Sequence, residues 1–168
     1  MSGHIRYQTL ADCPEHIPYL ANLYYQALGK IWSNDTSMDM ARSWLETHLN
    51  RNSLPLTLVA LEGDNPVGMV SLLEDDGLGA TLTPWLGSLV VHPDYRHRKI
   101  GETLIQKLIE KAKSLEFKSL YLFAYELEIT RWYENLGWQH LGKDIYKEHP
   151  VYVMEYPMEN ESYVAQTA

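Results

Sequence analysis

The sequence predicts an α/β fold in which a mixed β-sheet of about seven strands carries helices on both of its faces. Two observations lead to this prediction. Apolar runs of strand length alternate with amphipathic helical patterns, so that the elements follow in the order β-α-α-β-β-β-α-β-α-β-β. In addition, the stretch 85–115 joins an apolar run, a short basic turn and a long helical pattern. With 168 residues, of which 45% are hydrophobic and 21% charged, the chain is long enough to bury a substantial core.

The first half of the chain predicts three strands and two helices. Residues 5–9 alternate in polarity, and the turn sequence at 63–66 joins two apolar runs into an antiparallel hairpin. Two segments between them have apolar residues at helical spacing, and Gly29 is expected to end the first of these helices. The predicted elements are strands 5–9, 54–61 and 67–73 and helices 14–32 and 38–49.

The second half predicts four strands and two helices. The apolar run at 86–91 ends where Pro93 removes a backbone donor. Apolar residues from Ile100 to Leu115 then recur on one helical face. Gly137 stands where a left-handed residue ends the shorter of the two helices. The predicted elements are strands 86–91, 119–123, 138–142 and 151–156 and helices 101–115 and 128–136.

The turn between the central strand and the long helix is expected to bind an anion. Its cations Arg96, Arg98 and Lys99 crowd together and would repel one another without a counter-charge. Residues 92–113 hold six basic and three acidic residues, a net +3, so the rest of a chain with net charge −8 sums to −11. A helix that begins at Gly101 also presents free N–H groups and the positive end of its dipole to the turn.

The same turn resembles the acyl-CoA-binding motif of the GNAT family of N-acetyltransferases, in which Gln/Arg-x-x-Gly-x-Gly/Ala cradles the pyrophosphate of coenzyme A. The six positions here are Arg96-His97-Arg98-Lys99-Ile100-Gly101. Arg96 and Gly101 match, whereas Lys99 replaces the first glycine and His97 replaces a frequent glycine. If Lys99 has a positive φ, it is strained by roughly 1 kcal/mol. If its φ is negative, its amide still faces the phosphate and its side chain adds a charge.

This resemblance implies a mostly antiparallel sheet and acetyl-CoA as a co-substrate. It also implies that the backbone of Leu89, Val90 and Val91 pairs with the pantetheine arm as an added strand does. One of their N–H groups is then expected to hold the thioester carbonyl while charge develops on its oxygen. The resemblance assigns the pyrophosphate to the turn and the helix start, at Arg96, His97, Arg98, Lys99, Ile100, Gly101 and Glu102.

A second motif, the segment WYENLGW at 132–138, resembles the (F/Y)YxxLGF segment of that family, in which a tyrosine points at the sulfur of the coenzyme. Tyr133 takes this position here. A departing thiolate needs a proton or a hydrogen bond, and a phenol stays protonated at neutral pH and donates one. The alternative is that Tyr133 packs in the core. The neighbouring Trp132 and Trp138 are both expected to be core residues.

A base is needed as well, because the attacking amine arrives as an ammonium ion and has to lose a proton. Glu74, with Asp75 and Asp76 beside it, is the nearest acidic candidate, since it directly follows the third predicted strand. A carboxylate that does not reach the amine can act through a water molecule. The alternative for these three residues is a solvated, charged loop.

Composition limits the other classes of function. The single cysteine, Cys13, excludes an internal disulfide, and the seven histidines have no zinc-ligand spacing, so no metal is expected. The net charge of −8 argues against a nucleic-acid partner. No signal-peptide pattern is present, and no apolar run reaches the length of about 18 residues that a membrane span needs. We therefore expect a cytoplasmic single domain over 1–156, a monomer or homodimer, with a polar tail at 157–168 and no membrane partner.

The resemblance implies an acetyl-CoA-dependent N-acetyltransferase that moves an acetyl group by direct transfer to a primary amine. The amine belongs either to a small molecule or to a peptide N-terminus, and its identity is not predicted. The alternative on the same fold is a non-catalytic coenzyme A-binding sensor or interaction module. Four aromatic residues of the first predicted helix either line an acceptor cleft or pack in the core: Tyr19, Tyr24, Tyr25 and Trp32.

Overall fold

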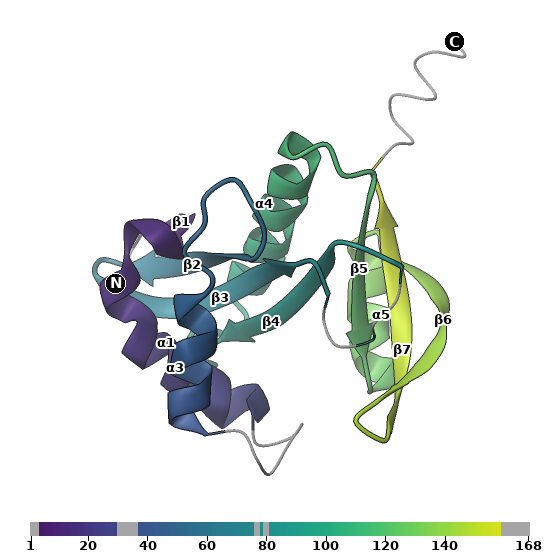
Figure 1. Cartoon of the computed structure of the whole chain (residues 1–168), viewed down its shortest axis with the longest axis horizontal. Helices are drawn as coiled ribbons and strands as arrows, with labels where there is room; N and C mark the ends of the chain where they lie inside the picture. Colours follow the sequence, from purple (N-terminus) through teal and green to yellow (C-terminus); the bar gives the residue numbers. More distant parts are fainter. Residues whose placement is uncertain (1–3, 30–36, 76–77, 79–80, 159–168) are drawn as a thin grey trace.

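The computed structural model describes residues 4–29, 37–75, 78 and 81–158, and these residues build one sheet. Its strands are β1 (Ile5–Thr9), β2 (Leu56–Glu62), β3 (Asn65–Leu73), β4 (Trp85–Val91), β5 (Ser119–Ala124), β6 (Gln139–Tyr146) and β7 (His149–Pro157). They lie side by side in the order β1-β2-β3-β4-β5-β7-β6 (Figure 1). Neighbouring strands are antiparallel except β4 and β5, which are parallel. The predicted mixed, mostly antiparallel sheet of seven strands is therefore confirmed.

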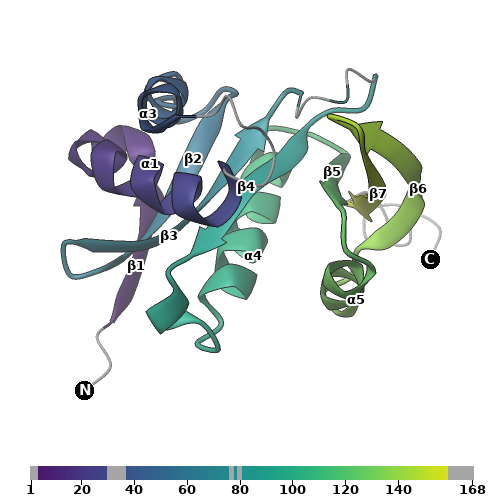
Figure 2. The ribbon, with the colours of Figure 1, turned by 90° about the horizontal axis from the view of Figure 1, so that it is seen from below.

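Helices cover both faces of this sheet, as predicted. The α-helices of the described part of the chain are α1 (Ile17–Tyr24), α3 (Met38–Glu46), α4 (Ile100–Ser114) and α5 (Leu127–Asn135). Figure 2 shows α1 and α3 over one face of the half-sheet β1–β4, with α4 under the opposite face. It also shows α5 on the side of α4, where it covers the half-sheet β5–β7.

The core lies on both faces of the first half-sheet, because its strands are apolar on both sides. On β2, Leu58 packs in the cluster around α4, whereas its neighbour Val59 packs in the cluster around α1 and α3. The apolar face of α4 is buried as its spacing predicts, and Leu104 and Leu108 have no exposed surface. Each such leucine stabilises the fold by about 1.5–3 kcal/mol. This packing fixes α4, and with it the turn that precedes the helix, against the sheet.

The two half-sheets separate at β4 because this strand contains a β-bulge. Met69 of β3 lies opposite Val90, and Ser71 lies opposite Gly87, so Ser88 and Leu89 together face the single residue between Met69 and Ser71. Ser88 has a φ of 55°, and an extra residue of this kind bends a strand. β4 pairs with β5 only at Trp85, before the bulge. Beyond that point the two strands diverge, as Figures 1 and 2 show.

The first helix is shorter than the predicted 14–32. A proline is tolerated only in the first helical turn, so Pro18 sets the start of α1 at Ile17, and Pro14 instead begins a short 3-10 turn at Pro14–His16. After Tyr24 the chain continues as a π-helical turn, Tyr25–Gly29. Trp32, at the end of the predicted helix, lies outside the described residues.

Strands β6 and β7 are longer than the predicted 138–142 and 151–156, because a tight hairpin joins them. The two loop residues, Lys147 and Glu148, have φ values of 46° and 69°. Positive φ at both positions is typical of a type I′ turn, which favours Asn-Gly and similar pairs. Lys-Glu gives no such sequence signal, so the hairpin was not predicted.

The described helices include none that is long and apolar enough to cross a membrane. At the C-terminus β7 runs to Pro157, and the N–H of Met158 donates to the carbonyl of Lys118 at 2.8 Å. The rest of the predicted tail, 159–168, lies outside the described residues, so the predicted extent of the domain stays a prediction.

Candidate active site

Tyr133 lies in the last turn of α5, and the end of this helix fixes its backbone. Gly137 has a φ of 103° and donates its N–H to the carbonyl of Glu134 at 3.0 Å. The N–H of Trp138 donates to the carbonyl of Tyr133 at 3.1 Å. These two hydrogen bonds form a Schellman motif, the usual way in which a glycine of positive φ ends a helix. The predicted helix end at Gly137 is therefore confirmed.

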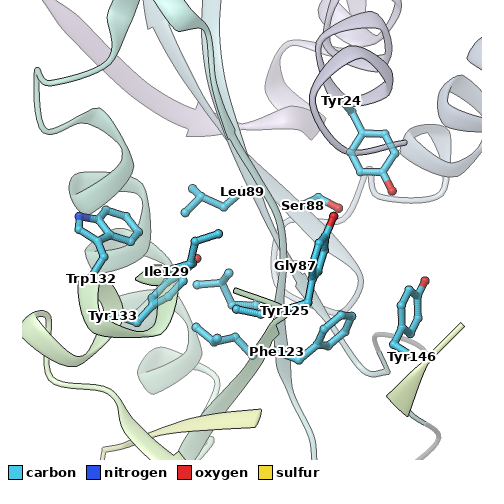
Figure 3. A pocket seen from close by; sticks show the side chains of 13 residues that line it. Tyr24, Gly87, Ser88, Leu89, Phe123, Tyr125, Ile129, Trp132, Tyr133 and Tyr146 are labelled. Carbon is cyan, nitrogen blue, oxygen red and sulfur yellow. The ribbon is translucent and has the colours of Figure 1, made fainter. Parts of the chain in front are cut away.

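The side chain of Tyr133 reaches a cavity of about 310 Å³ between α5, β4 and β5, here called the central cavity. Tyr133 is 7% exposed, and this burial raises the pKa of its phenol above the ordinary value. At neutral pH the hydroxyl is therefore a hydrogen-bond donor. In Figure 3 it points from α5 towards β4, with Trp132 at one end of the cavity and Tyr24 and Tyr146 at the other.

Of the two alternatives for Lys99, a strained positive φ or a negative φ, the structure has the positive φ. Lys99 has a φ of 60° and His97 a φ of 64°, so both take the left-handed conformation that glycine adopts without strain. Lys99 is also the N-cap residue of α4, and its side chain makes no capping hydrogen bond to the first helical turn. The first N–H that bonds back to the turn is that of Thr103, which donates to the Lys99 carbonyl at 3.1 Å. Among the described residues, the amides of 100–102 have no hydrogen-bond partner.

These amides and the turn border a second cavity of about 370 Å³, here called the turn cavity. The end of a helix dipole and unpaired N–H groups make such a place favourable for an anion. The structure brings together here every predicted coenzyme-binding residue except Arg98, namely Leu89, Val90, Val91, Arg96, His97, Lys99, Ile100, Gly101 and Glu102.

Arg98 has an internal counter-charge instead. Its guanidinium lies 3.3 Å from a carboxylate oxygen of Glu62, at the end of β2, and 4.9 Å from the centre of the Tyr95 ring. Tyr95 donates its hydroxyl to the same carboxylate at 2.8 Å. The mutual repulsion expected in this turn is thus relieved at Arg98. The cationic side chains that line the turn cavity are Arg96 and Lys99.

The turn cavity and the central cavity form one groove along β4, because Leu89 and Trp132 line both of them. Past Trp85, no strand in the described part of the chain pairs with the edge of β4 that faces β5. An extended ligand with amide groups can pair with such an edge as an added strand does. Leu89 lies next to the positive-φ residue Ser88, and both residues line the central cavity (Figure 3).

The two tryptophans of the WYENLGW segment differ in burial. Trp138 is 2% exposed, which confirms the prediction of a core residue. The same prediction for Trp132 is wrong, because Trp132 is 36% exposed. Neighbouring residues point about 100° apart on a helix, so the face that buries Tyr133 leaves Trp132 at the surface. Its indole lies beside Gly101 at the start of α4, where it lines both cavities.

A third cavity of about 510 Å³, here called the outer cavity, continues from the central cavity on the side of α1 and α3. Tyr24, Ser88 and Tyr146 line both. The predicted base Glu74 and its neighbour Asp75 are exposed and line the outer cavity, whereas Asp76 lies outside the described residues. Tyr24 thus lines a cleft, one of the two alternatives for the first helix. Its ring also stacks on Trp44 of α3, with 5.5 Å between centroids.

His48 is the most buried polar residue of the outer cavity, with 1% exposed surface. Its Nδ1 lies 2.6 Å from the carbonyl of Trp44. Because a carbonyl only accepts, Nδ1 carries the proton and Nε2 has a lone pair. Nε2 is buried and has no hydrogen-bond partner among the described residues. Burial lowers the pKa of His48 to about 4, so the imidazole is neutral at physiological pH.

Sequence reasoning missed Trp44, His48 and Tyr146 as site residues. The spacing of Trp44 and His48 by four positions places both on one helical face, and this was the signal available. Tyr146 ends β6, whose length depends on a hairpin that the sequence did not reveal. No group of three or more His, Cys, Asp or Glu residues in the described ranges has the arrangement of a metal site.

Comparison with known proteins gives consistent results. A model of the acetyltransferase (GNAT) family matches residues 17–138. The uncharacterized N-acetyltransferase ycf52 of Pyropia yezoensis is 30% identical over 91 residues, which are 53% of this chain and 49% of that protein. The amino-acid acetyltransferase of Azotobacter vinelandii is 30% identical over 89 residues, 47% of this chain and 20% of that protein. The matches thus span half or less of these relatives.

Solved structures show the same fold at lower sequence identity. An aminoglycoside 6'-N-acetyltransferase complexed with coenzyme A has a TM-score of 0.70 and 17% identity, and the alignment covers 92% of this chain and 97% of that one. At this identity the likeness is one of fold.

Proposed function

We propose, because the chain belongs to the acetyltransferase (GNAT) family, that it is an acetyl-CoA-dependent N-acetyltransferase that transfers the acetyl group directly to a primary amine. One observation carries this proposal: three cavities follow one another along β4, with Tyr133 in the middle one. An anion turn lies at one end of this row and carboxylates lie at the other. A direct transfer needs two substrates to meet at one point, and a continuous groove with two ends suits this requirement.

The residues of the turn and of β4 fit coenzyme A. The amides of 100–102 and the edge of β4 have no backbone partner among the residues that the structure describes. These amides, with the cations Arg96 and Lys99, suit the diphosphate, and the β4 edge suits the amide groups of the pantetheine arm. When bound, the coenzyme supplies the acetyl group as a reactive thioester. The groove then directs the thioester towards the central cavity, past Leu89 and Trp132.

In the transfer, the amine nitrogen bonds to the thioester carbonyl carbon and the carbon–sulfur bond breaks. The N–H of Leu89 donates to the carbonyl oxygen, where negative charge develops. Tyr133 donates its hydroxyl to the departing sulfur. The raised pKa of Tyr133 favours a hydrogen bond over full loss of its proton, so Tyr133 stays protonated throughout. After the attack the nitrogen carries one proton more than the amide keeps, and this proton passes to the sulfur, which leaves as a thiol. Glu74, acting through a water molecule, receives the proton that the ammonium group gives up before attack.

Thiol release tests this function. The protein is mixed with acetyl-CoA and, in turn, with small amines and with short peptides, and the free thiol is measured over time. We expect release that depends on the amine, with the acetylated amine detected by mass spectrometry. Coenzyme binding by calorimetry without any amine-dependent release would contradict the proposal and support the non-catalytic coenzyme A-binding module.

A further inference from the structure

The charged residues that line the outer cavity are acidic. Its charged residues are the carboxylates Glu74 and Asp75, and its described lining contains no lysine or arginine. Both carboxylates also line an adjoining cavity of about 580 Å³ beyond β3, which has no basic residue in its described lining either. The two carboxylates therefore lie where the outer cavity meets this adjoining cavity, whereas Ser88 lines the outer cavity where it meets the central cavity. Such a lining attracts a cation and repels an anion.

His48 adds an acceptor that does not depend on pH in the physiological range. Its Nδ1 is held by the Trp44 carbonyl, which leaves the buried Nε2 with a lone pair and no partner among the described residues. Buried polar atoms without partners are rare in folded proteins, and a catalytic role or a bound water molecule or ion commonly accounts for them. The group that satisfies Nε2 has to be a donor, such as an N–H.

The walls between these acceptors are aromatic. The Tyr24 and Trp44 rings are stacked, and the imidazole of His48 lies 4.1 Å from the Trp44 ring, centre to centre. Tyr146 lines the opening towards the central cavity (Figure 3). Aromatic faces bind ammonium groups through the ring quadrupole, most strongly at tryptophan. Carboxylates, a neutral imidazole and aromatic faces are all favourable for the same ligand group.

We propose that the acceptor is a small molecule with two amino groups, an inference that rests on the proposed function. One amino group, in its neutral form, passes Ser88 and attacks the thioester. The other stays positively charged in the outer cavity, where the carboxylate of Asp75 and Nε2 of His48 accept its N–H groups. A peptide N-terminus, which has one amino group beside a backbone amide, leaves this second site unfilled unless its side chains supply a cation.

Calorimetry with two matched amines tests the inference. Diaminobutane has an amino group at each end of a four-carbon chain, and butylamine has the same chain with one amino group. We expect diaminobutane to bind the protein about tenfold more tightly than butylamine or better, a difference of roughly 1.4 kcal/mol. Asp75→Asn should shrink this ratio towards one. The control Asp64→Asn removes the same charge from the turn between β2 and β3, where the side chain is fully exposed, and should keep the ratio.

The outcomes separate this inference from the proposed function. Equal affinities for the two amines, no binding of either, or a ratio that Asp75→Asn leaves unchanged would overturn the inference. Thiol release from acetyl-CoA with the same amines gives the second readout. Selective binding of diaminobutane without thiol release would leave the inference standing and contradict the proposed function. Thiol release at equal rates with both amines, together with equal affinities, would support the proposed function and overturn the inference.

Discussion

The ring of Trp138 meets the ring of Tyr133 edge to face, with 5.7 Å between the centroids and 71° between the planes. The backbone N–H of Trp138 also donates a hydrogen bond to the carbonyl of Tyr133 at the end of α5. A contact of side chains across the helix end commonly accompanies this kind of cap. Together the two contacts hold the Tyr133 hydroxyl in the central cavity. A group that has to meet one sulfur atom gains from such fixed placement, because small displacements lower the rate steeply.

The first prediction concerns Gly137, which makes this helix end possible. A Cβ at Gly137 would lie 3.0 Å from a ring carbon of Tyr156, and the residue has a φ of 103°. We expect Gly137→Ala to lower the free energy of unfolding by about 1–2 kcal/mol and to lower kcat more than coenzyme affinity. Denaturant unfolding and thiol release measure the two effects. The control Gly142→Ala on β6, where a Cβ meets nothing within 4 Å, should change neither.

The second prediction concerns the hydroxyl of Tyr133. Tyr133→Phe keeps the ring and its packing but removes the donor, so kcat should fall by about a hundredfold or more while acetyl-CoA binds as it does to the wild type. Because burial raises the pKa of Tyr133, its ionisation should cause no loss of activity between neutral pH and about pH 10. Tyr7→Phe on β1, far from the groove, serves as the control. Wild-type turnover in Tyr133→Phe would remove this residue from the mechanism.

The third prediction separates strain from charge at Lys99. Both Lys99→Ala and Lys99→Gly remove the ammonium group, but only glycine relieves the left-handed φ of 60°. We expect the glycine variant to be more stable than the alanine variant by about 1 kcal/mol. Both should bind acetyl-CoA with the same reduced affinity. Urea unfolding and calorimetry measure these quantities, and equal stabilities of the two variants would show that the turn relaxes when the side chain is lost.

Much of this fold was predictable because its signals are local. The apolar spacing of α4, the turn at 63–66 and the glycine at the end of α5 each depend on a few neighbouring residues. The amphipathic face of α4 also gave the position of the anion turn. The six-residue motif then gave the residues around the turn cavity, since a helix start fixes the amides next to it.

What the sequence did not give depends on contacts between distant segments. The bulge at Ser88 was indicated only by Gly87 within a strand, a sign of bulges that is weak by itself. The engagement of Arg98 by Glu62, 36 positions earlier, follows from the register of β2 and not from the turn. The outer cavity combines α1, α3, the end of β3 and the end of β6, so no single stretch of sequence reveals that His48 lines it.

The fourth prediction concerns pH and His48. Its pKa is lowered from 6.5 to about 4 in the folded chain, so protonation favours the unfolded chain. The neutral imidazole contributes to the free energy of unfolding above about pH 6.5, and this contribution is lost as the pH falls towards 4. The wild type should therefore lose up to roughly 3 kcal/mol over this range relative to His48→Asn, which does not titrate. Urea unfolding at several pH values measures this difference, and parallel pH profiles would contradict the prediction.

The central claim is that the turn before α4 binds the diphosphate of acetyl-CoA, and calorimetric titration of acetyl-CoA into the wild type, Arg96→Ala and Arg98→Ala tests it most directly. We predict one saturable site in the wild type. Arg96→Ala should weaken binding by about 1–3 kcal/mol, and Arg98→Ala should weaken it less, because Glu62 already holds that guanidinium. No heat of binding in the wild type, or wild-type affinity in Arg96→Ala, would contradict the account.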